Sequence, residues 1–319
     1  MEQISLSILG SSSAIPLSNR SPSAQFLSIA DEHFLIDCGE GTQVKLRQHR
    51  IGFSRIKHIL ISHLHGDHFY GLIPLLTSLQ LLERQQAVHL YGPQELEEVL
   101  RTFLKMTQAK IQYPLKFHPL NKNSKTLIYE SEQLEVHSFP LRHSVDCFGF
   151  YFQEKARPRK MNKELLEKLD IPVAEIRGIK NGKDWLDKRG KRYPNEELTL
   201  DPPAAFSYAY CSDTLPVKHL HRYFKGVDLL YHEATFLNKD RERALAPTHS
   251  TAEQAAEIAE ICDSRYLLLG HFSARYRNLD PIIEEARTIF KRSYEAREGY
   301  RFYLNRDRES LQMEKESKY

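Results

Sequence analysis

Short apolar runs that end in polar turns recur along this chain and predict alternating strands and helices. Runs rich in Val, Ile, Leu, Phe and Tyr, bounded by Gly, Pro, Asp or Ser, predict strands. They lie at 4–9, 33–37, 57–62, 87–92, 134–141, 147–152, 204–213, 228–235, 265–272 and 300–305. Helical spacing of apolar residues predicts helices at 42–50, 69–82, 93–105, 250–262 and 280–292. Strands and helices mixed along the whole length favour a layered α/β architecture.

Two of the predicted helices have recognisable start signals. Ser250 is followed three residues later by Glu253, which is the spacing of a capping box. Asp280 and Pro281 introduce the last helix, since proline is favoured in the first helical turn. We therefore expect the helices to begin at these residues.

Residues 154–200 interrupt the alternation of predicted strands and helices. The segment is highly charged, contains Pro158, Pro172 and Pro194, and has only one convincing helix, at 162–170. Between Glu154 and Arg192 there are 13 basic and 7 acidic residues, a net charge of +6, against +3 for the whole chain. We expect a flexible arm inserted into a single domain spanning 1–319. A basic surface of this kind fits a phosphate-rich partner or a solvated hairpin.

Composition limits the class of protein. A chain of 319 residues with 41% hydrophobic content can bury a sizeable core. We find no signal-peptide pattern and no uninterrupted apolar run of about 18 residues, so we expect an unexported protein without a membrane span. Four scattered cysteines without CxxC spacing predict neither disulfides nor a cysteine zinc site, which fits the cytoplasm.

The run "HLHGDH", residues 63–68, follows the predicted strand at 57–62. His63 and His65 are two residues apart, so in an extended chain both imidazoles can face one point. Asp67 and His68 follow Gly66, where the chain can bend toward a second point. Imidazole and carboxylate ligands suit zinc, although manganese or iron is also compatible.

Six residues cannot fill two metal shells, so the hypothesis needs ligands from other strand ends. His143, Asp213 and His271 each follow an apolar run and precede a polar turn. Taken singly, each fits a packed histidine or a turn residue; together with the motif they make seven ligands from four strand ends. A carboxylate such as Asp213 can bridge two metals ~3.5–4 Å apart, the spacing used for displacement at phosphorus.

The stretch "SHLHGDHFYGL" resembles the signature of the metallo-β-lactamase superfamily. "FLIDCGEGTQ", "HEATF" at 232–236, "HST" at 249–251 and "GHFSARY" at 270–276 narrow the resemblance to the short, bacterial form of tRNase Z, over nearly the whole chain. The resemblance implies a four-layer αββα sandwich and an endonuclease that trims the 3′ trailer from precursor tRNA. It also implies a homodimer whose flexible arm grips tRNA, although the arm here lacks the Gly-Pro-rich tip common in bacteria.

The resemblance also assigns the ligands of two zinc ions. His63, His65, His143 and Asp213 correspond to one set, and Asp67, His68, Asp213 and His271 to the other. Asp67 corresponds to the proton acceptor for the attacking water.

Three further residues outside the ligand sets are candidates for the reaction. We expect His249, oriented by Glu233, to protonate the leaving 5′ oxygen. Arg275 is a candidate for contact with substrate phosphate or for an internal ion pair.

Two other functions remain open from the sequence. One is another hydrolase of the same fold that acts on a small ester or thioester, because the superfamily covers several chemistries. The other is an RNA-binding subunit with a decayed site, which intact ligands disfavour.

Overall fold

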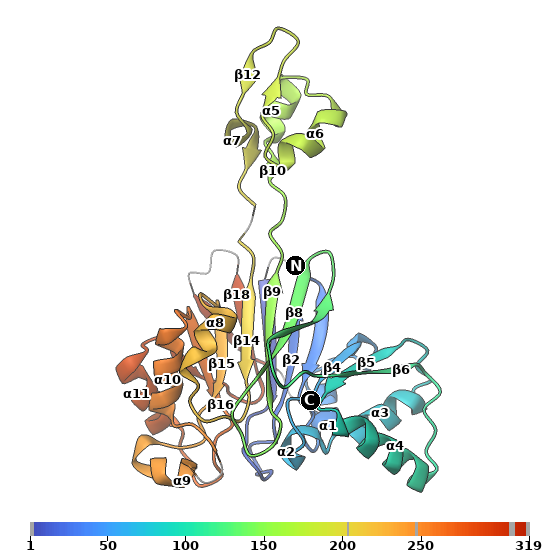
Figure 1. Ribbon diagram of the computed structural model, residues 1–319, viewed down its shortest axis with the longest axis vertical. Coiled ribbons are helices and arrows are strands. Elements are labelled where there is room, and N and C mark those ends of the chain that lie inside the picture. The colour runs from blue at the N-terminus through green and yellow to red at the C-terminus, as the bar shows by residue number, and fades with distance from the viewer. Residues whose placement is uncertain (1–2, 203, 246–247, 306–309, 317–319) are drawn as a thin grey trace. The chain divides into compact units, whose positions relative to one another are not determined.

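The computed structural model describes residues 3–202, 204–245, 248–305 and 310–316. The chain divides into two compact units, one formed by Met1–Gln153 with Phe206–Tyr319 and the other by Glu154–Ala205. The larger unit is built on two sheets, and the smaller one has its own elements (Figure 1).

The first sheet has eight strands among the described residues. In spatial order they are β19 (Leu311–Lys315), β18 (Tyr300–Asn305), β1 (Gln3–Gly10), β2 (Ala24–Ile29), β3 (Glu32–Ile36), β4 (His58–Leu60), β5 (Val88–Gly92) and β6 (Leu115–Pro119). The strands from β3 to β6 run parallel, in registers such as Leu35↔Ile59 and Ile59↔Leu90. Their carboxyl ends therefore meet at one edge, where the residues after β3 and β4 lie.

The second sheet has seven strands in the described part of the chain. Their order is β17 (Ser293–Glu295), β16 (Tyr266–Gly270), β15 (Leu229–Glu233), β14 (Ser207–Cys211), β9 (Phe148–Glu154), β8 (Leu134–Pro140) and β7 (Thr126–Glu130). The strands from β14 to β17 are parallel, with Cys211 paired to His232 and His232 to Leu269. Asp213, Glu233 and His271 therefore follow or end neighbouring parallel strands.

Helices cover the outer face of each sheet (Figure 1). Helices α1 (Thr42–Gln48), α3 (Leu72–Leu81) and α4 (Glu95–Thr107) pack leucines against the first sheet, and the short α2 (Gly66–Phe69) lies within the motif. Helices α8 (His221–Phe224), α10 (Ala252–Ile261) and α11 (Asp280–Ile289) cover the second. The inner faces bury aromatic side chains between the sheets, among them Phe34, Phe152, Tyr208 and Tyr231. The layered α/β prediction is confirmed.

Short elements complete the larger unit. They are α9 (Arg241–Leu245) and the 3₁₀ turns η1 (Phe53–Arg55), η2 (Lys218–Leu220) and η3 (Asn238–Asp240). None of the helices in the described ranges has the length and apolar character needed to cross a membrane.

The smaller unit, Glu154–Ala205, has more regular structure than the sequence indicated. It contains β10 (Lys160–Met161), α5 (Lys163–Lys168), α6 (Val173–Lys180), β11 (Trp185–Leu186), β12 (Arg192–Tyr193), α7 (Asn195–Leu198) and β13 (Thr199–Leu200). The prediction of a single helix is wrong: α6 begins after Pro172 and continues through Gly178. Ile171, Ile179, Trp185 and Leu198 form a small core that compensates for these weak helix formers.

The capping prediction at α10 is also wrong, by one residue. Thr251 is the N-cap, its hydroxyl accepts from the Gln254 backbone amide, and the Gln254 side chain accepts from the Thr251 amide. Ser250 instead donates its hydroxyl to the Thr214 carbonyl oxygen at 2.7 Å. Both pairs have the spacing of a capping box, and tertiary contact decides between them.

Candidate metal centre

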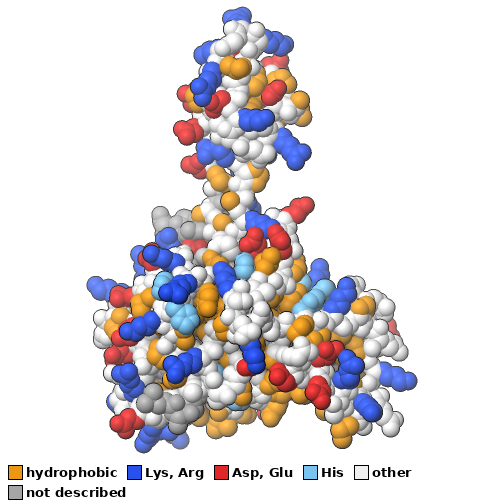
Figure 2. Space-filling view, viewed as in Figure 1, with side chains coloured by type: hydrophobic (Ala, Val, Ile, Leu, Met, Phe, Trp, Pro, Cys, Tyr) orange, Lys and Arg blue, Asp and Glu red, His pale blue; other side chains and the backbone are white. Residues whose placement is uncertain are grey.

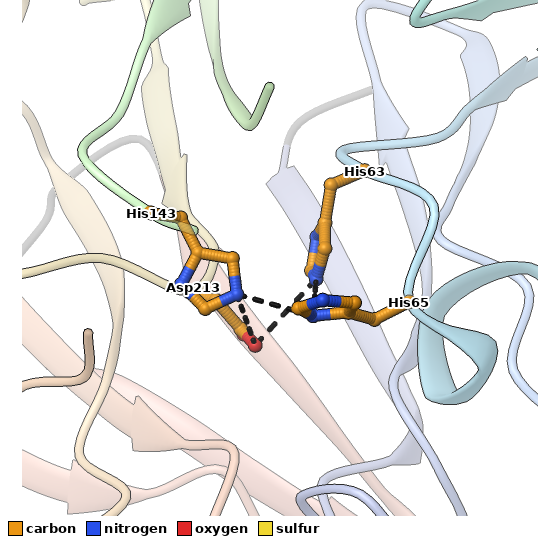
Figure 3. Close-up of side chains that lie close together, drawn as sticks. All are labelled: His63, His65, His143 and Asp213. Carbon is orange, nitrogen blue, oxygen red and sulfur yellow. Dashed lines mark hydrogen bonds and ion pairs between the residues drawn. The ribbon is translucent and has the colours of Figure 1, made fainter. Parts of the chain in front are cut away.

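The first predicted ligand set converges in the structure (Figure 3). His63, His65, His143 and Asp213 each offer one ligand atom, and these atoms lie within 4.8 Å of one another. His65 Nδ1 is 3.1 Å from both His63 Nε2 and His143 Nε2. Burial lowers the pKa of all three imidazoles, which keeps them in the neutral, metal-binding form.

The second set lies beside the first. Asp67, His68 and His271 also bring ligand atoms within 4.8 Å. His271 Nε2 is 3.3 Å from both His68 Nε2 and Asp67 Oδ2. The backbone amide of Ala14 donates to Asp67 Oδ2 at 2.7 Å, so the loop after β1 helps to hold this carboxylate.

Asp213 connects the two sets. Its Oδ2 is 3.6 Å from His63 Nε2 and 3.8 Å from His143 Nε2, on the side of the first set. Its Oδ1 is 3.3 Å from His68 Nε2 and 3.2 Å from His271 Nε2, on the side of the second. Asp213 is 2% exposed, and Oδ1 has no hydrogen-bond partner among the described residues. A buried carboxylate oxygen surrounded by imidazole nitrogens fits a bound cation.

The outer nitrogen of four ligand histidines is held by a partner, which turns the inner nitrogen toward the centre. His63 Nδ1 is 3.0 Å from Ser62 Oγ, and His271 Nδ1 is 2.9 Å from Thr235 Oγ1. His143 Nδ1 lies 2.8 Å from Thr248 Oγ1, and His68 Nδ1 lies 2.8 Å from Asp37 Oδ2. Such partners fix the ring orientation and tautomer of metal-binding histidines.

Asp37 is a buried residue in contact with His68 that the sequence did not single out as part of the site. It is fully buried directly after β3 with φ of 56°, a left-handed conformation that few residues other than glycine, asparagine and aspartate adopt. It accepts from the Ser62 amide at 2.7 Å and from the Tyr210 hydroxyl at 2.6 Å, besides its contact with His68. The strand stop at "DCG" marked its position, but its contacts come from Ser62 and His68, which follow β4, and from Tyr210 in β14.

His249 and Glu233 form a buried pair beside the two sets. His249 Nδ1 is 2.9 Å from Glu233 Oε1, and Glu233 also accepts from the amides of Thr214 and Thr235. Burial favours the neutral imidazole, but the Glu233 carboxylate prevails and raises the pKa of His249 to about 9. Asp213, His249 and His271 also form a possible ligand group, so the geometry alone permits His249 to bind metal.

A cavity of about 400 Å³ opens onto these residues. Its lining includes His65, Asp67, Asp213, His249 and His271. Arg275 does not line it: this exposed side chain places its guanidinium carbon 6.0 Å from the centre of the Phe236 ring. The structure thus brings nine of the ten predicted site residues together around one centre and leaves Arg275 outside the cavity lining.

Two packed sheets, each parallel over part of its strands and covered by helices on its outer face, carry a His/Asp cluster compatible with metal binding at the strand ends. These features define a metallo-β-lactamase fold. The structure resembles the metallo-β-lactamase fold protein YhfI of Bacillus subtilis, with a TM-score of 0.67 and 16% identity over 95% of this chain and all of that one. It also resembles the short form of human tRNase Z, with a TM-score of 0.67 and 25% identity over 92% and 96% of the two chains.

Sequence relatives identify the family within this fold. The chain is 40% identical to ribonuclease Z of Bacteroides thetaiotaomicron, over 96% of both proteins. It is 41% identical to ribonuclease Z of Bacteroides fragilis, over 94% of this chain and 98% of the relative. A family model described as Anti-Pycsar protein Apyc1 matches residues 4–162. The chain belongs to the ribonuclease Z family of endoribonucleases.

Proposed function

We propose that this protein removes the 3′ trailer from precursor tRNA with two zinc ions held by the seven converging ligands. The observation that carries the proposal is Asp213, whose two oxygens face separate imidazole sets in a buried site. Two zinc ions bound there would lower the pKa of water toward ~7 and neutralise the charge that develops on the phosphate oxygens. Family membership supplies the substrate class.

The residues around the ligands supply the proton transfers. The Asp67 carboxylate lines the cavity and accepts a hydrogen bond from the Ala14 amide. It takes the proton of the attacking water. His249 lines the same cavity and uses Nδ1 for Glu233, which leaves its other ring nitrogen to protonate the departing 5′ oxygen. Arg275 is exposed and contacts substrate phosphate once the RNA is bound.

The unit Glu154–Ala205 serves as the tRNA-binding arm. Figure 2 shows basic side chains over its surface. Lys188, Arg189 and Lys191 lie in the turn between β11 and β12, and Arg192 begins β12, where it pairs with Asp184. The turn is well built: Asp187 Oδ1 accepts from the amides of Arg189 and Lys191, and Gly190 supplies a φ of 80°. A hydrogen-bonded turn with three cations fits the phosphates of a folded RNA.

Reversing the charge of this turn should weaken cleavage of tRNA without altering the chemistry. We expect Lys188→Glu with Arg189→Glu and Lys191→Glu to lower kcat/KM on precursor tRNA roughly 10-fold or more and to flatten its salt dependence, because phosphate contacts are lost. Hydrolysis of a small chromogenic phosphodiester should stay unchanged. Reversal of the exposed Lys105, Lys110 and Lys116 is the matched control. An equal loss on both substrates would contradict the arm's role.

A homodimer is the proposed assembly. Leu81 and Met106 are each 78% exposed, at the ends of α3 and α4, and Leu82 and Phe103 add to the apolar surface. Both helices pack on the same sheet, so this surface suits a second copy of the chain. A dimer would sediment at twice the chain mass of 37.2 kDa.

We place the enzyme in the cytoplasm, where its RNA substrate is made. All four cysteines are buried and unpaired, which suits a reducing compartment.

Incubation of the purified protein with a 3′-extended tRNA tests the proposed function. We expect a single cut that leaves a 3′ hydroxyl on the tRNA, and its loss when a chelator removes the metal. Restoration by zinc would complete the result. Cleavage that persists in chelator, or no cleavage with zinc supplied, would contradict the proposal.

A further inference from the structure

Tyr70 is a large side chain in the metal cavity that the proton transfers leave unused. It directly follows α2, which carries Asp67 and His68, and lines the same cavity as His65, Asp67 and His249. Its residue surface is 64% exposed, a high fraction for a large aromatic side chain.

The ring of Tyr70 is held in place from one side. A Cβ built on Gly66 would lie 2.2 Å from Tyr70 Cε2 and 2.5 Å from Cζ, so the ring packs closely over the Gly66 backbone. The ring of Phe69 meets it edge-on, with centroids 5.1 Å apart and planes at 65°. The ring therefore contacts Gly66 and Phe69 on one side, and its remaining surface is open to solvent.

The rest of the cavity lining away from the ligands offers no comparable surface. It consists of small or polar residues and two prolines: Ser13, Ala14, Pro16, Pro22, Glu40 and Gly66. A phosphodiester bound between the ligand sets brings a nucleobase on each side within reach of the cavity wall. Bases stack on aromatic rings whatever their sequence, which suits an enzyme that must process many tRNAs.

We propose that the ring of Tyr70 is a stacking platform for a nucleobase that flanks the scissile phosphate. This role rests on the proposed action on RNA and assigns to Tyr70 the alignment of the chain at the metal centre. The aromatic ring makes the stacking contact, and the hydroxyl group is not needed for it. Tyr70→Phe should therefore keep full activity, whereas Tyr70→Ala should raise KM and lower kcat/KM roughly 5- to 150-fold, the range expected for one lost base stack.

Abasic substrates make the test specific to stacking. Precursor tRNAs would carry an abasic nucleotide either immediately 5′ or immediately 3′ of the cleaved bond, and each would be compared with the intact substrate in the wild type and both variants. One of the two abasic sites should lower kcat/KM several-fold for the wild type and for Tyr70→Phe. It should leave kcat/KM of Tyr70→Ala nearly unchanged, because that variant has already lost the stacking contact. Met313→Ala removes a 48% exposed apolar side chain outside the cavity lining and is the matched control.

The outcomes separate this inference from the function on which it rests. Failure of the wild type to cut intact precursor tRNA would overturn the function and the platform together. With wild-type cleavage in place, equal abasic penalties in the wild type and Tyr70→Ala would overturn the platform alone. Loss of activity in Tyr70→Phe would assign the role to the hydroxyl and also overturn it. Zinc content unchanged in Tyr70→Ala excludes disruption of the ligands.

Discussion

Replacing Asp213 with asparagine is expected to abolish cleavage of precursor tRNA and to release metal. The amide keeps the size of the side chain but cannot give an anionic oxygen to each ligand set. Changes to the partners of ligands already cost about 10- to 100-fold in metal affinity or activity, so loss of a shared ligand should exceed roughly 10³-fold. Metal analysis after dialysis should show fewer than two zinc ions per chain.

Asp146→Asn is the matched control for this prediction. Asp146 lies near His143 in the chain but pairs with Lys122 at the surface. It should keep both metals and full activity. Two tightly bound zinc ions in Asp213→Asn would rule out the bridging role.

Replacing His249 with alanine should lower kcat on precursor tRNA by roughly 10²–10⁴-fold with zinc content unchanged. The imidazole faces the cavity and is held by Glu233, a suitable arrangement for donating a proton to the leaving alkoxide. The exposed His219→Ala is the control. Zinc lost together with activity would instead make His249 a ligand, which its place near Asp213 and His271 permits.

A change of leaving group sharpens the test of His249. Bis(4-nitrophenyl) phosphate releases a stabilised phenolate that needs little protonation, whereas the RNA releases a basic alkoxide. The alanine variant should therefore lose far less activity on the chromogenic diester. An equal loss on both substrates would mean that His249 does not act as the general acid.

The sequence predicted the buried core of the fold better than its edges. Strands such as β15 and β16 are buried on both faces, so they appear as continuous apolar runs. The pattern missed β6, β7 and β19, in which most positions are partly or fully exposed, and β17, which has only three residues. It also missed β2, which is fully buried but contains Ala, Gln and Ser and therefore has no continuous run of large apolar residues.

The candidate site shows a similar division. One motif predicted the ligands His63, His65, Asp67 and His68. Positions directly after predicted strands indicated the other three, His143, Asp213 and His271. The sequence did not predict the residues that contact the outer nitrogens of these histidines, because Asp37, Thr235 and Thr248 reach them from distant segments of the chain. The local sequence indicates which side chains lie at the end of a strand. Which imidazole each of these side chains contacts depends on how the two sheets pack together.

Diffraction from crystals of the zinc-loaded protein, measured on both sides of the zinc absorption edge, would locate the metal ions directly. We expect two anomalous peaks ~3.5–4 Å apart, one within each ligand set and both in contact with Asp213. A single peak, or two peaks that share no ligand, would contradict this expectation.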